Sequence, residues 1–332
     1  MSNGKISETS GSINIKRLTM QPKKIINWLL EYNSVIIFII LAVVSSIISK
    51  SFFTERNIFN LLRQMSGLGI ISMGMLMVIL TSGIDLSVGS IVALSSVLSA
   101  YFALSMPLPA AIALTILMGV VFGVFSGYLV SVKKLAPFVV TLAAMTIARG
   151  FAFIISKGAP IMVEQEGLTS FGADYFLRVP YPVYLMFAIF IAILIILRYT
   201  VFGRMIIAIG SNEVAVRLSG IRVTYYKLMV YVFSGAFSAI AGIISTSRTG
   251  VGSPLVGDGF ELDAIAAVVI GGASLNGGKG SALNTFLGVL ILGMIGNIMN
   301  LMNVPAYPQQ VIKGLIIIIA VILQKSESFK EA

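Results

Sequence analysis

The sequence predicts an all-α polytopic membrane protein with about ten transmembrane helices and an inverted repeat. Of its 332 residues, 57% are hydrophobic and only 11% are charged, and the mean hydropathy is +0.99. Soluble globular proteins contain roughly 45–50% apolar and about 25% charged residues. The composition therefore excludes a soluble enzyme and a nucleic-acid-binding protein that folds in water.

The chain contains neither cysteine nor histidine. Disulfides, thiolate chemistry, the commonest general base and the commonest metal ligand are therefore absent from the sequence. We expect no catalytic residues, no metal site and no cofactor. Any function has to come from a small number of polar groups in an apolar chain.

Ten apolar segments are candidates for membrane crossing, which takes about 20 residues of helix. The segment 263–275 is short for a complete crossing and predicts a broken or tilted helix. The polar and apolar residues of 51–64 predict a separate amphipathic helix at the outer membrane interface. The ten segments are 33–49, 66–82, 87–104, 109–132, 137–156, 181–197, 228–247, 263–275, 281–302 and 309–323.

The positive charges predict the orientation of these segments. With an even number of spans and both termini in the cytoplasm, fifteen of the 23 Lys and Arg residues fall on the cytoplasmic side, as the positive-inside rule requires. We expect a polar cytoplasmic tail over residues 1–24, a single transmembrane domain over 25–325 and a second cytoplasmic tail over 326–332.

Two parts of the chain share a pattern. Residues 119–150 and 288–314 each contain a Gly-rich helix, a short connector, proline and a second helix that ends at glycine. The predicted spans place the two copies in opposite orientations, which is typical of transporters. Gly119, Gly123 and Gly127 form a small-residue stripe, which predicts close helix packing.

The segment Gly83–Ser90 reads GIDLSVGS and places Asp85 between two apolar spans. An acid inside the membrane costs at least about 2.5–3.5 kcal/mol and needs a partner or a wet cavity. One hypothesis places Asp85 on a transport pathway. The preferred one is that Asp85 caps a broken helix end through backbone N–H groups and that Ser87 caps the next helix. Asn284 and Asn297, on a later span, are candidates for lining a path or for packing hydrogen bonds.

The segment Gly203–Val223 is too charged to be buried in lipid. Gly210 to Asn212 predict a turn and an N-cap, followed by a short helix over Glu213–Leu218 and a stop at Gly220. A short rigid helix in a cytoplasmic loop can act as a lever on the attached spans. It can equally be a surface loop that follows the positive-inside rule, and the residues alone leave both interpretations open.

Two glycine-rich stretches follow. Gly250–Asp263 predicts an outer loop whose acids Asp258, Glu261 and Asp263 are candidates for docking an external partner. GGASLNGGKGS, from Gly271, superficially looks like a phosphate-binding loop but lacks the spacing G-x-x-x-x-G-K-[ST] and a preceding strand. We therefore do not expect ATP to bind there.

Three of these stretches together resemble the permease subunits of bacterial ABC sugar importers of the ribose, galactose and xylose type. GIDLSVGS resembles the N-terminal signature of that family. FGRMIIAIGSNEVAVRLSGIRV, from Phe202, resembles its cytoplasmic coupling segment, and ELDAIAAVVIGGASLNGGKGS, from Glu261, resembles its C-terminal signature. The resemblance covers nearly the whole chain beyond residue 30.

The resemblance implies a monosaccharide permease, with ribose as the first expectation, in the inner membrane of a bacterium. Its implied partners are a cytoplasmic ATPase with two fused nucleotide domains, an extracytoplasmic sugar-binding protein, a second permease copy that forms a homodimer, and membrane lipid. ATP hydrolysis would occur in the ATPase and not in this chain. The implied coupling residues are Gly203, Arg204, Gly210, Asn212, Glu213, Arg217, Leu218, Ser219 and Gly220.

Two alternatives stay open at this point. One is a permease for another small solute such as an amino acid. The other is a proton-coupled secondary transporter that uses Asp85 as its relay.

Overall fold

The structure, a computed structural model, describes residues 33–331, and the predicted tail 1–24 lies outside them. Short antiparallel pairs join β1 (Ile161–Met162) to β4 (Val251–Gly252) and β2 (Tyr175–Phe176) to β3 (Val179–Pro180). The helices are α2 (Asn33–Ile48), α3 (Glu55–Leu80), α4 (Val88–Ala103), α5 (Leu108–Ser131), α6 (Pro137–Ser156), α7 (Glu166–Ala173), α8 (Tyr181–Tyr199), α9 (Val201–Ser211), α10 (Glu213–Leu218), α11 (Val223–Thr249), α12 (Phe260–Ile270), α13 (Ala282–Leu301) and α14 (Ala306–Glu331).

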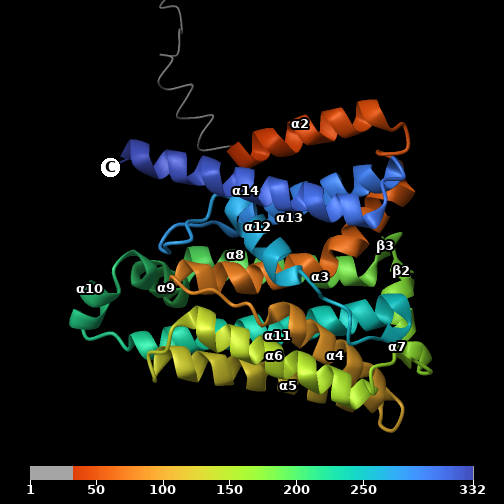
Figure 1. Cartoon of the computed structure of the whole chain (residues 1–332), viewed down its shortest axis with the longest axis horizontal. Coiled ribbons are helices and arrows are strands. Elements are labelled where there is room, and N and C mark those ends of the chain that lie inside the picture. Colours follow the sequence, from red (N-terminus) through yellow and green to blue (C-terminus); the bar gives the residue numbers. More distant parts are fainter. Residues whose placement is uncertain (1–32, 332) are drawn as a thin grey trace, which may run out of the picture.

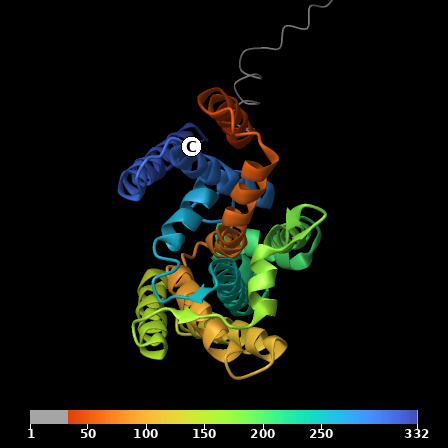
Figure 2. The ribbon, with the colours of Figure 1, turned by 90° about the vertical axis from the view of Figure 1, so that its right-hand side faces the viewer.

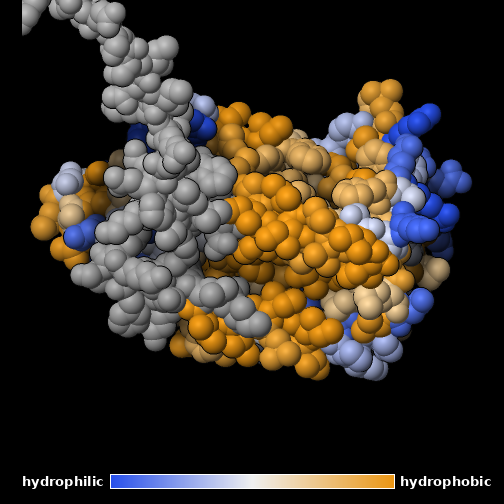
Figure 3. Space-filling model, turned by 90° about the horizontal axis from the view of Figure 1, so that it is seen from above, coloured by the Kyte–Doolittle hydropathy of each residue, from blue (hydrophilic) through white to orange (hydrophobic). Residues whose placement is uncertain are grey.

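The long helices lie side by side along one direction, and the two ends of the bundle differ (Figure 1). One end, the α10 end, carries α10, the beginning of α2 and the C-terminus of the chain. The opposite end, the strand end, carries α7, β2 and β3. Figure 3 shows a broad apolar surface over the middle of the helices and hydrophilic residues beyond it at the strand end. The membrane normal therefore runs along the helices.

Within residues 33–331, six helices are long and apolar enough to cross a membrane: α3, α5, α6, α8, α11 and α13. Shorter apolar helices include α2 and α4. The predicted count of about ten complete crossings is therefore not confirmed, although the all-α membrane fold is. The expected break at 263–275 is present, because α12 has 11 residues and spans about 16 Å of a hydrocarbon layer about 30 Å thick.

The predicted interfacial helix over 51–64 is wrong as a separate element. Thr54 caps α3, with its hydroxyl accepting a hydrogen bond from the N–H of Asn57, and the helix continues without interruption to Leu80. The polar residues of its first turns mislead the sequence-based prediction. Arg56 faces an outer groove and Gln64 faces a cavity between helices, so neither marks a helix lying on the membrane surface.

Helix α11 lies inside the bundle and packs on α3, α4 and α5 (Figure 2). The predicted glycine stripe is confirmed as a packing surface. A Cβ atom on Gly119 or Gly123 would overlap the backbone of α11 at Gly235 or Tyr231. Only glycine admits so close an approach, which compensates for the missing hydrophobic effect between helices in lipid.

The order of the helices agrees with an inverted repeat. Contacts of Gly67 with Ala241 and of Gly74 with Ser234 show that α3 and α11 are antiparallel. Helix α5 is antiparallel to α11, and α13 is antiparallel to α3, so α5–α6 and α13–α14 run in opposite senses. After α3 the chain unwinds over 81–87 before α4, and after α11 it continues over 250–259 before α12.

Candidate functional site

Two helices begin within the membrane domain and run away from each other. Asp85, just before α4, bonds Ser234 near the middle of α11, and α4 then runs toward the strand end. Helix α12 begins at Phe260 and runs toward the α10 end. Their first turns meet at Gly89, where a Cβ atom would overlap the carbonyl oxygen of Gly257 and the carboxylate of Glu261. We call Gly89, Gly257 and Glu261 the half-helix junction.

The half-helix junction places negative charge where helix dipoles favour it. A helix N-terminus carries a partial positive charge from its unpaired N–H groups. Glu261 lies in the first turn of α12 and touches the first turn of α4. Discontinuous helices that meet near the midplane form the substrate and ion sites of many transporters. This geometry therefore makes the junction the first candidate for a transport pathway.

Asp85 is 1% exposed and accepts three hydrogen bonds. Its Oδ1 accepts from the N–H and the hydroxyl of Ser87, at 3.0 and 2.5 Å, and its Oδ2 accepts from the Ser234 hydroxyl at 2.7 Å. The preferred prediction is capping through backbone N–H groups, but only one of the three donors to Asp85 is a backbone N–H and the other two are serine hydroxyls. Ser87 does occupy the N-cap position of α4, but its side chain makes no cap hydrogen bond, because its hydroxyl donates to Asp85.

Arg149 of α6 holds the segment that leads into α12. Its Nη1 donates to the carbonyl oxygens of Pro254 at 2.7 Å and Val256 at 3.0 Å, and its Nε donates to the Ser90 hydroxyl at 3.3 Å. The carboxylates of Asp258 and Glu261 supply the nearby negative charge. The half-buried guanidinium of Arg149 therefore holds the unwound backbone through hydrogen bonds, and the two acids balance its charge.

The predicted short helix is present with its predicted bounds. In α10, Glu213–Leu218, the side-chain oxygen of Asn212 accepts a hydrogen bond from the N–H of Ala215 at 2.9 Å. Gly220 follows with φ +80°, a conformation that glycine adopts without steric strain. Gly210 and Ser211 differ from the prediction, because they end α9 instead of forming a turn.

Glu213 connects α10 to one membrane helix and to the connection between two others. Its carboxylate accepts hydrogen bonds from Arg217 in the same helix and from Lys227 of α11, each at 2.5 Å. Lys134, between α5 and α6, lies 3.6 Å from the same carboxylate. We call these four residues the Glu213 cluster. It fastens α10 to α11 and to the α5–α6 connection.

The charge of Glu213 is stabilised in the fold. Partial burial alone would raise its pKa, but the hydrogen bond and positive charge of Lys227, the hydrogen bond of Arg217 and the field of Lys134 outweigh burial. The net result is a pKa below the ordinary value of glutamate. The cluster is therefore intact at every pH near neutrality.

A second contact fastens α9 to the rest of the bundle. The Ser82 hydroxyl donates to the carbonyl oxygens of Asn276 at 2.7 Å and Gly210 at 3.3 Å. The N–H of Gly278 donates to the carbonyl oxygen of Leu80 at 3.0 Å. The loop with the superficial likeness to a phosphate-binding motif, which connects α12 to α13, is thus a packing element. Its contacts join the end of α3 to the end of α9.

The remaining predicted coupling residues lie at the ends of α9 and α10. Thr200 caps α9 by accepting a hydrogen bond from the N–H of Gly203 at 3.2 Å. Arg204 is exposed on the same helix. Ser219 ends α10, and its hydroxyl donates to the carbonyl oxygen of Ala215 at 3.0 Å. All nine predicted residues therefore belong to one continuous structure at the α10 end.

The three predicted outer acids separate in the structure. Asp258 is exposed, whereas Glu261 lies at the half-helix junction. Asp263 bonds Lys313 of α14 at 2.9 Å. The last two residues differ from the prediction of an outer loop because α12 begins at Phe260 and carries them into the bundle.

Asn284 and Asn297 lie near opposite ends of α13, about 20 Å apart along the helix. Asn297 exchanges two hydrogen bonds with Asn57 of α3, each 2.9 Å long. It also lines a cavity of about 80 Å³, which we call the amide cavity. Its lining residues are Gln64, Met65, Leu68, Asp263, Leu292, Gly293, Gly296, Asn297, Asn300, Gln309 and Lys313.

Sequence reasoning missed the amide cavity. The available signal is helical spacing, since Asn297 and Asn300 are three residues apart, and Gln309 and Lys313 are four apart. Each pair lies on one face of its helix. Among the described side chains, no group of three or more acids is placed to hold a metal ion.

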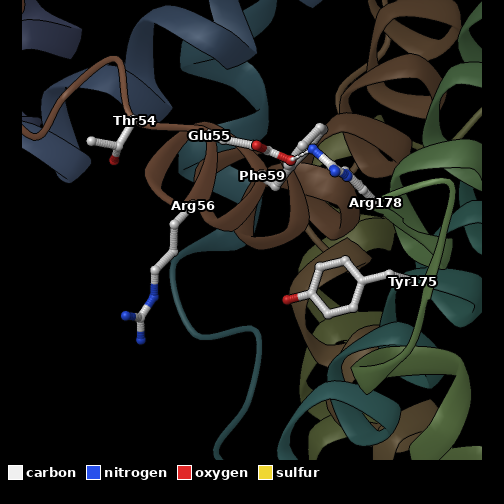
Figure 4. A pocket seen from close by; sticks show the side chains of 6 residues that line it. All are labelled: Thr54, Glu55, Arg56, Phe59, Tyr175 and Arg178. Carbon is white, nitrogen blue, oxygen red and sulfur yellow. Dashed lines mark ion pairs between the residues drawn. The ribbon is translucent and has the colours of Figure 1, made fainter.

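A separate hollow opens at the strand end. It has a volume of about 700 Å³ and is lined by Thr54, Glu55, Arg56, Phe59, Tyr175 and Arg178. Figure 4 shows Arg178 reaching from the β2–β3 hairpin toward Glu55 at the start of α3, and the two side chains form an ion pair at 3.7 Å. We call this hollow the outer groove.

An apolar bundle interrupted by two opposed half-helices, with a charged helix fastened outside it, is the architecture of a transport permease. The comparisons with known proteins agree. Residues 57–321 match the family model described as the permease component of a branched-chain amino acid transport system. No solved structure matches the chain significantly.

Curated relatives are similar over most of their length. The chain is 46% identical to the ribose import permease protein RbsC of Bacillus subtilis (strain 168) over 87% of this chain and 91% of that protein. It is 40% identical to RbsC of Escherichia coli (strain K12), over 90% and 95%. It is 38% identical to the L-arabinose transport system permease protein AraH of Escherichia coli (strain K12), over 89% and 90%.

The chain therefore belongs to the family of transport-system permease components that includes these sugar permeases. It is a multi-pass membrane protein, as the resemblance in the sequence predicts.

Proposed function

We propose that this chain is the membrane permease subunit of an ATP-binding-cassette importer that carries ribose or a similar monosaccharide into a bacterial cell. The relatives that are named as ribose and L-arabinose permeases support the substrate class. The α10 end faces the cytoplasm in this proposal, in accord with the positive charge of that side. Both termini then lie in the cytoplasm, and the protein resides in the inner membrane.

The single observation that carries the coupling role is the exposed apolar face of α10. Val214 and Leu218 lie four residues apart on this helix, and their side chains are 62% and 83% exposed. Such a pair outside the membrane belongs in the groove of a partner. The partner in this proposal is the ATPase subunit, which hydrolyses ATP while the permease itself does not.

Two sets of contacts described above can transmit a displacement of α10 to the membrane helices. The Glu213 cluster connects it to α11 and to the α5–α6 connection. The contact of Gly210 and Ser82 connects α9 to α3. Helices α3 and α11 each lead into one of the unwound segments that precede the half-helices, so a shift of α10 reaches the half-helix junction through packed elements.

The outer face receives a sugar-binding protein in this proposal. The outer groove offers charged and hydrogen-bonding groups at the strand end (Figure 4). A second copy of the chain completes the pathway as a homodimer, with lipid around the pair. A proton-coupled mechanism at Asp85 is not favoured, because the two serines that bond this acid make it part of a helix-end structure.

Reconstitution tests the proposal. The chain is placed in proteoliposomes with and without its ATPase and sugar-binding protein, and uptake of labelled ribose is measured. We expect uptake only with all components and ATP, with inhibition by vanadate and no effect of a protonophore. Sustained uptake by the chain alone, or collapse of uptake with the protonophore, would refute the proposal.

A further inference from the structure

The amide cavity concentrates polar groups among apolar helices. Its side chains come from α3, α12, α13 and α14, which are far apart in the sequence. The cavity lies toward the strand end of α13 and α14, where Asn300 is exposed and Gln309 is half-buried. Polar groups that line a cavity between membrane helices commonly mark the path of a solute.

The amide groups are only partly used by the protein. The Nε2 of Gln309 donates to Asn300 Oδ1 and to the carbonyl oxygen of Val304, both at 2.8 Å. An amide offers two donor hydrogens and an oxygen that accepts twice. Within the described residues this leaves Gln309 Oε1 as an acceptor and Asn300 Nδ2 as a donor. Gln64 and Asn297 bring two further amides to the cavity.

The charged groups of the cavity balance each other. Lys313 Nζ lies 2.9 Å from Asp263 Oδ2, and their side chains are 34% and 17% exposed. The pair therefore adds no net charge. Among the described residues, it leaves further N–H donors on Lys313 and the second carboxylate oxygen of Asp263.

Apolar groups complete the lining. Met65, Leu68 and Leu292 lie beside the amides. A lining without net charge that combines hydrogen-bond donors, acceptors and apolar groups suits a sugar, whose hydroxyl edge is polar and whose C–H face is not. Small-molecule sites combine apolar walls with a few placed polar groups in this way.

We infer that the amide cavity is a sugar subsite of the permease, which binds the hydroxyl groups of a monosaccharide through Asn300, Gln309 and the Asp263–Lys313 pair. This inference rests on the proposed function and identifies where the chain touches its substrate. A volume of about 80 Å³ is the room of roughly two to three water molecules. The cavity in this conformation therefore receives one edge of a sugar and not the entire ring.

A matched pair of glycines allows a clean steric test. Gly296 lines the cavity, and a Cβ atom added there meets no other atom within 4 Å. Gly314, on α14, is equally unobstructed but is not part of the lining. The Cβ atom of the substitution G296V therefore meets open space at the cavity, and G314V introduces the same side chain elsewhere. N300L removes the amide directly.

The experiment uses the full chain in lipid nanodiscs and measures weak ribose binding by saturation-transfer NMR, with leucine as a zwitterionic probe. We expect a ribose signal for the wild type and G314V, and a loss of about tenfold in affinity, which corresponds to about 1.4 kcal/mol, for G296V and N300L. Leucine should give no cavity-dependent signal. Circular dichroism and melting temperatures check that each variant is folded.

Three results would overturn the inference: unchanged ribose binding in G296V and N300L, cavity-dependent binding of leucine in place of ribose, or no ribose binding by the wild type. Uptake by the assembled importer separates this inference from the proposed function. If the wild-type assembly imports ribose but the cavity variants bind it normally, only the subsite is wrong. If the assembly imports no ribose, the proposed function itself fails.

Discussion

Replacing Glu213 by glutamine keeps the size of the side chain and removes its charge. Most of the lost stabilisation comes from the hydrogen bond with Lys227, because that side chain is only 17% exposed. The side chains of Arg217 and Lys134 are more than half exposed. Hydrogen bonds to charged groups contribute about 1.5–3 kcal/mol, and exposed ion pairs about 0–1 kcal/mol. Glu213 itself is 26% exposed, so solvent screens part of the interaction. We therefore expect E213Q to lose roughly 1–2 kcal/mol of the free energy that anchors α10.

That free energy corresponds to a factor of about 5 to 30 in the equilibrium between anchored and released α10. The assay is the number of sugar molecules imported for each ATP hydrolysed by the reconstituted importer. We expect E213Q to lower this ratio severalfold while basal hydrolysis continues, and R217Q to lower it less. Equal effects of the two substitutions, or an unchanged ratio in E213Q, would refute the role of the Lys227 bond.

Further predictions concern the same sites and the topology. Because the pKa of Glu213 is lowered, its stabilising contribution is complete above its ordinary pKa and is lost only as the pH falls through the lower folded value. Melting temperatures of wild type and E213Q should therefore differ by a constant amount from pH 8 to about pH 6 and converge in stronger acid. G89V should abolish transport, measured as ribose uptake, because its side chain overlaps the Gly257 backbone, while normal uptake would contradict the half-helix junction. R149L should lower the melting temperature more than R149K, since only lysine retains a charge and one donor for the carbonyl oxygens of the segment before α12; equal melting temperatures would count against that role. A reporter fused after Lys134 should be found in the cytoplasm, and an external signal would reverse the orientation.

Local signals in the sequence were enough for the elements whose formation depends on near neighbours. The membrane class follows from composition, and the short helix α10 follows from Asn212, the intervening residues and Gly220, which act within a few positions of one another. The break at α12 was visible because the apolar segment is too short to cross the membrane. The motif around Asp85 also indicated a helix end, although it did not identify Ser234 as a partner.

Tertiary structure decided everything that depends on residues distant in the chain. Local patterning suggested a separate interfacial helix over 51–64, because nothing nearby shows that Arg56 and Gln64 face a groove and a cavity.

The same reason explains the sites. Hydropathy alone does not pair Asp263 with Lys313, fifty residues away, or place Gly89 against Gly257. Composition and short-range spacing determined that this chain is a polytopic membrane protein with a short charged helix over Glu213–Leu218. Helix packing alone determined which polar groups meet in the membrane, because such contacts are made between side chains that the sequence keeps far apart.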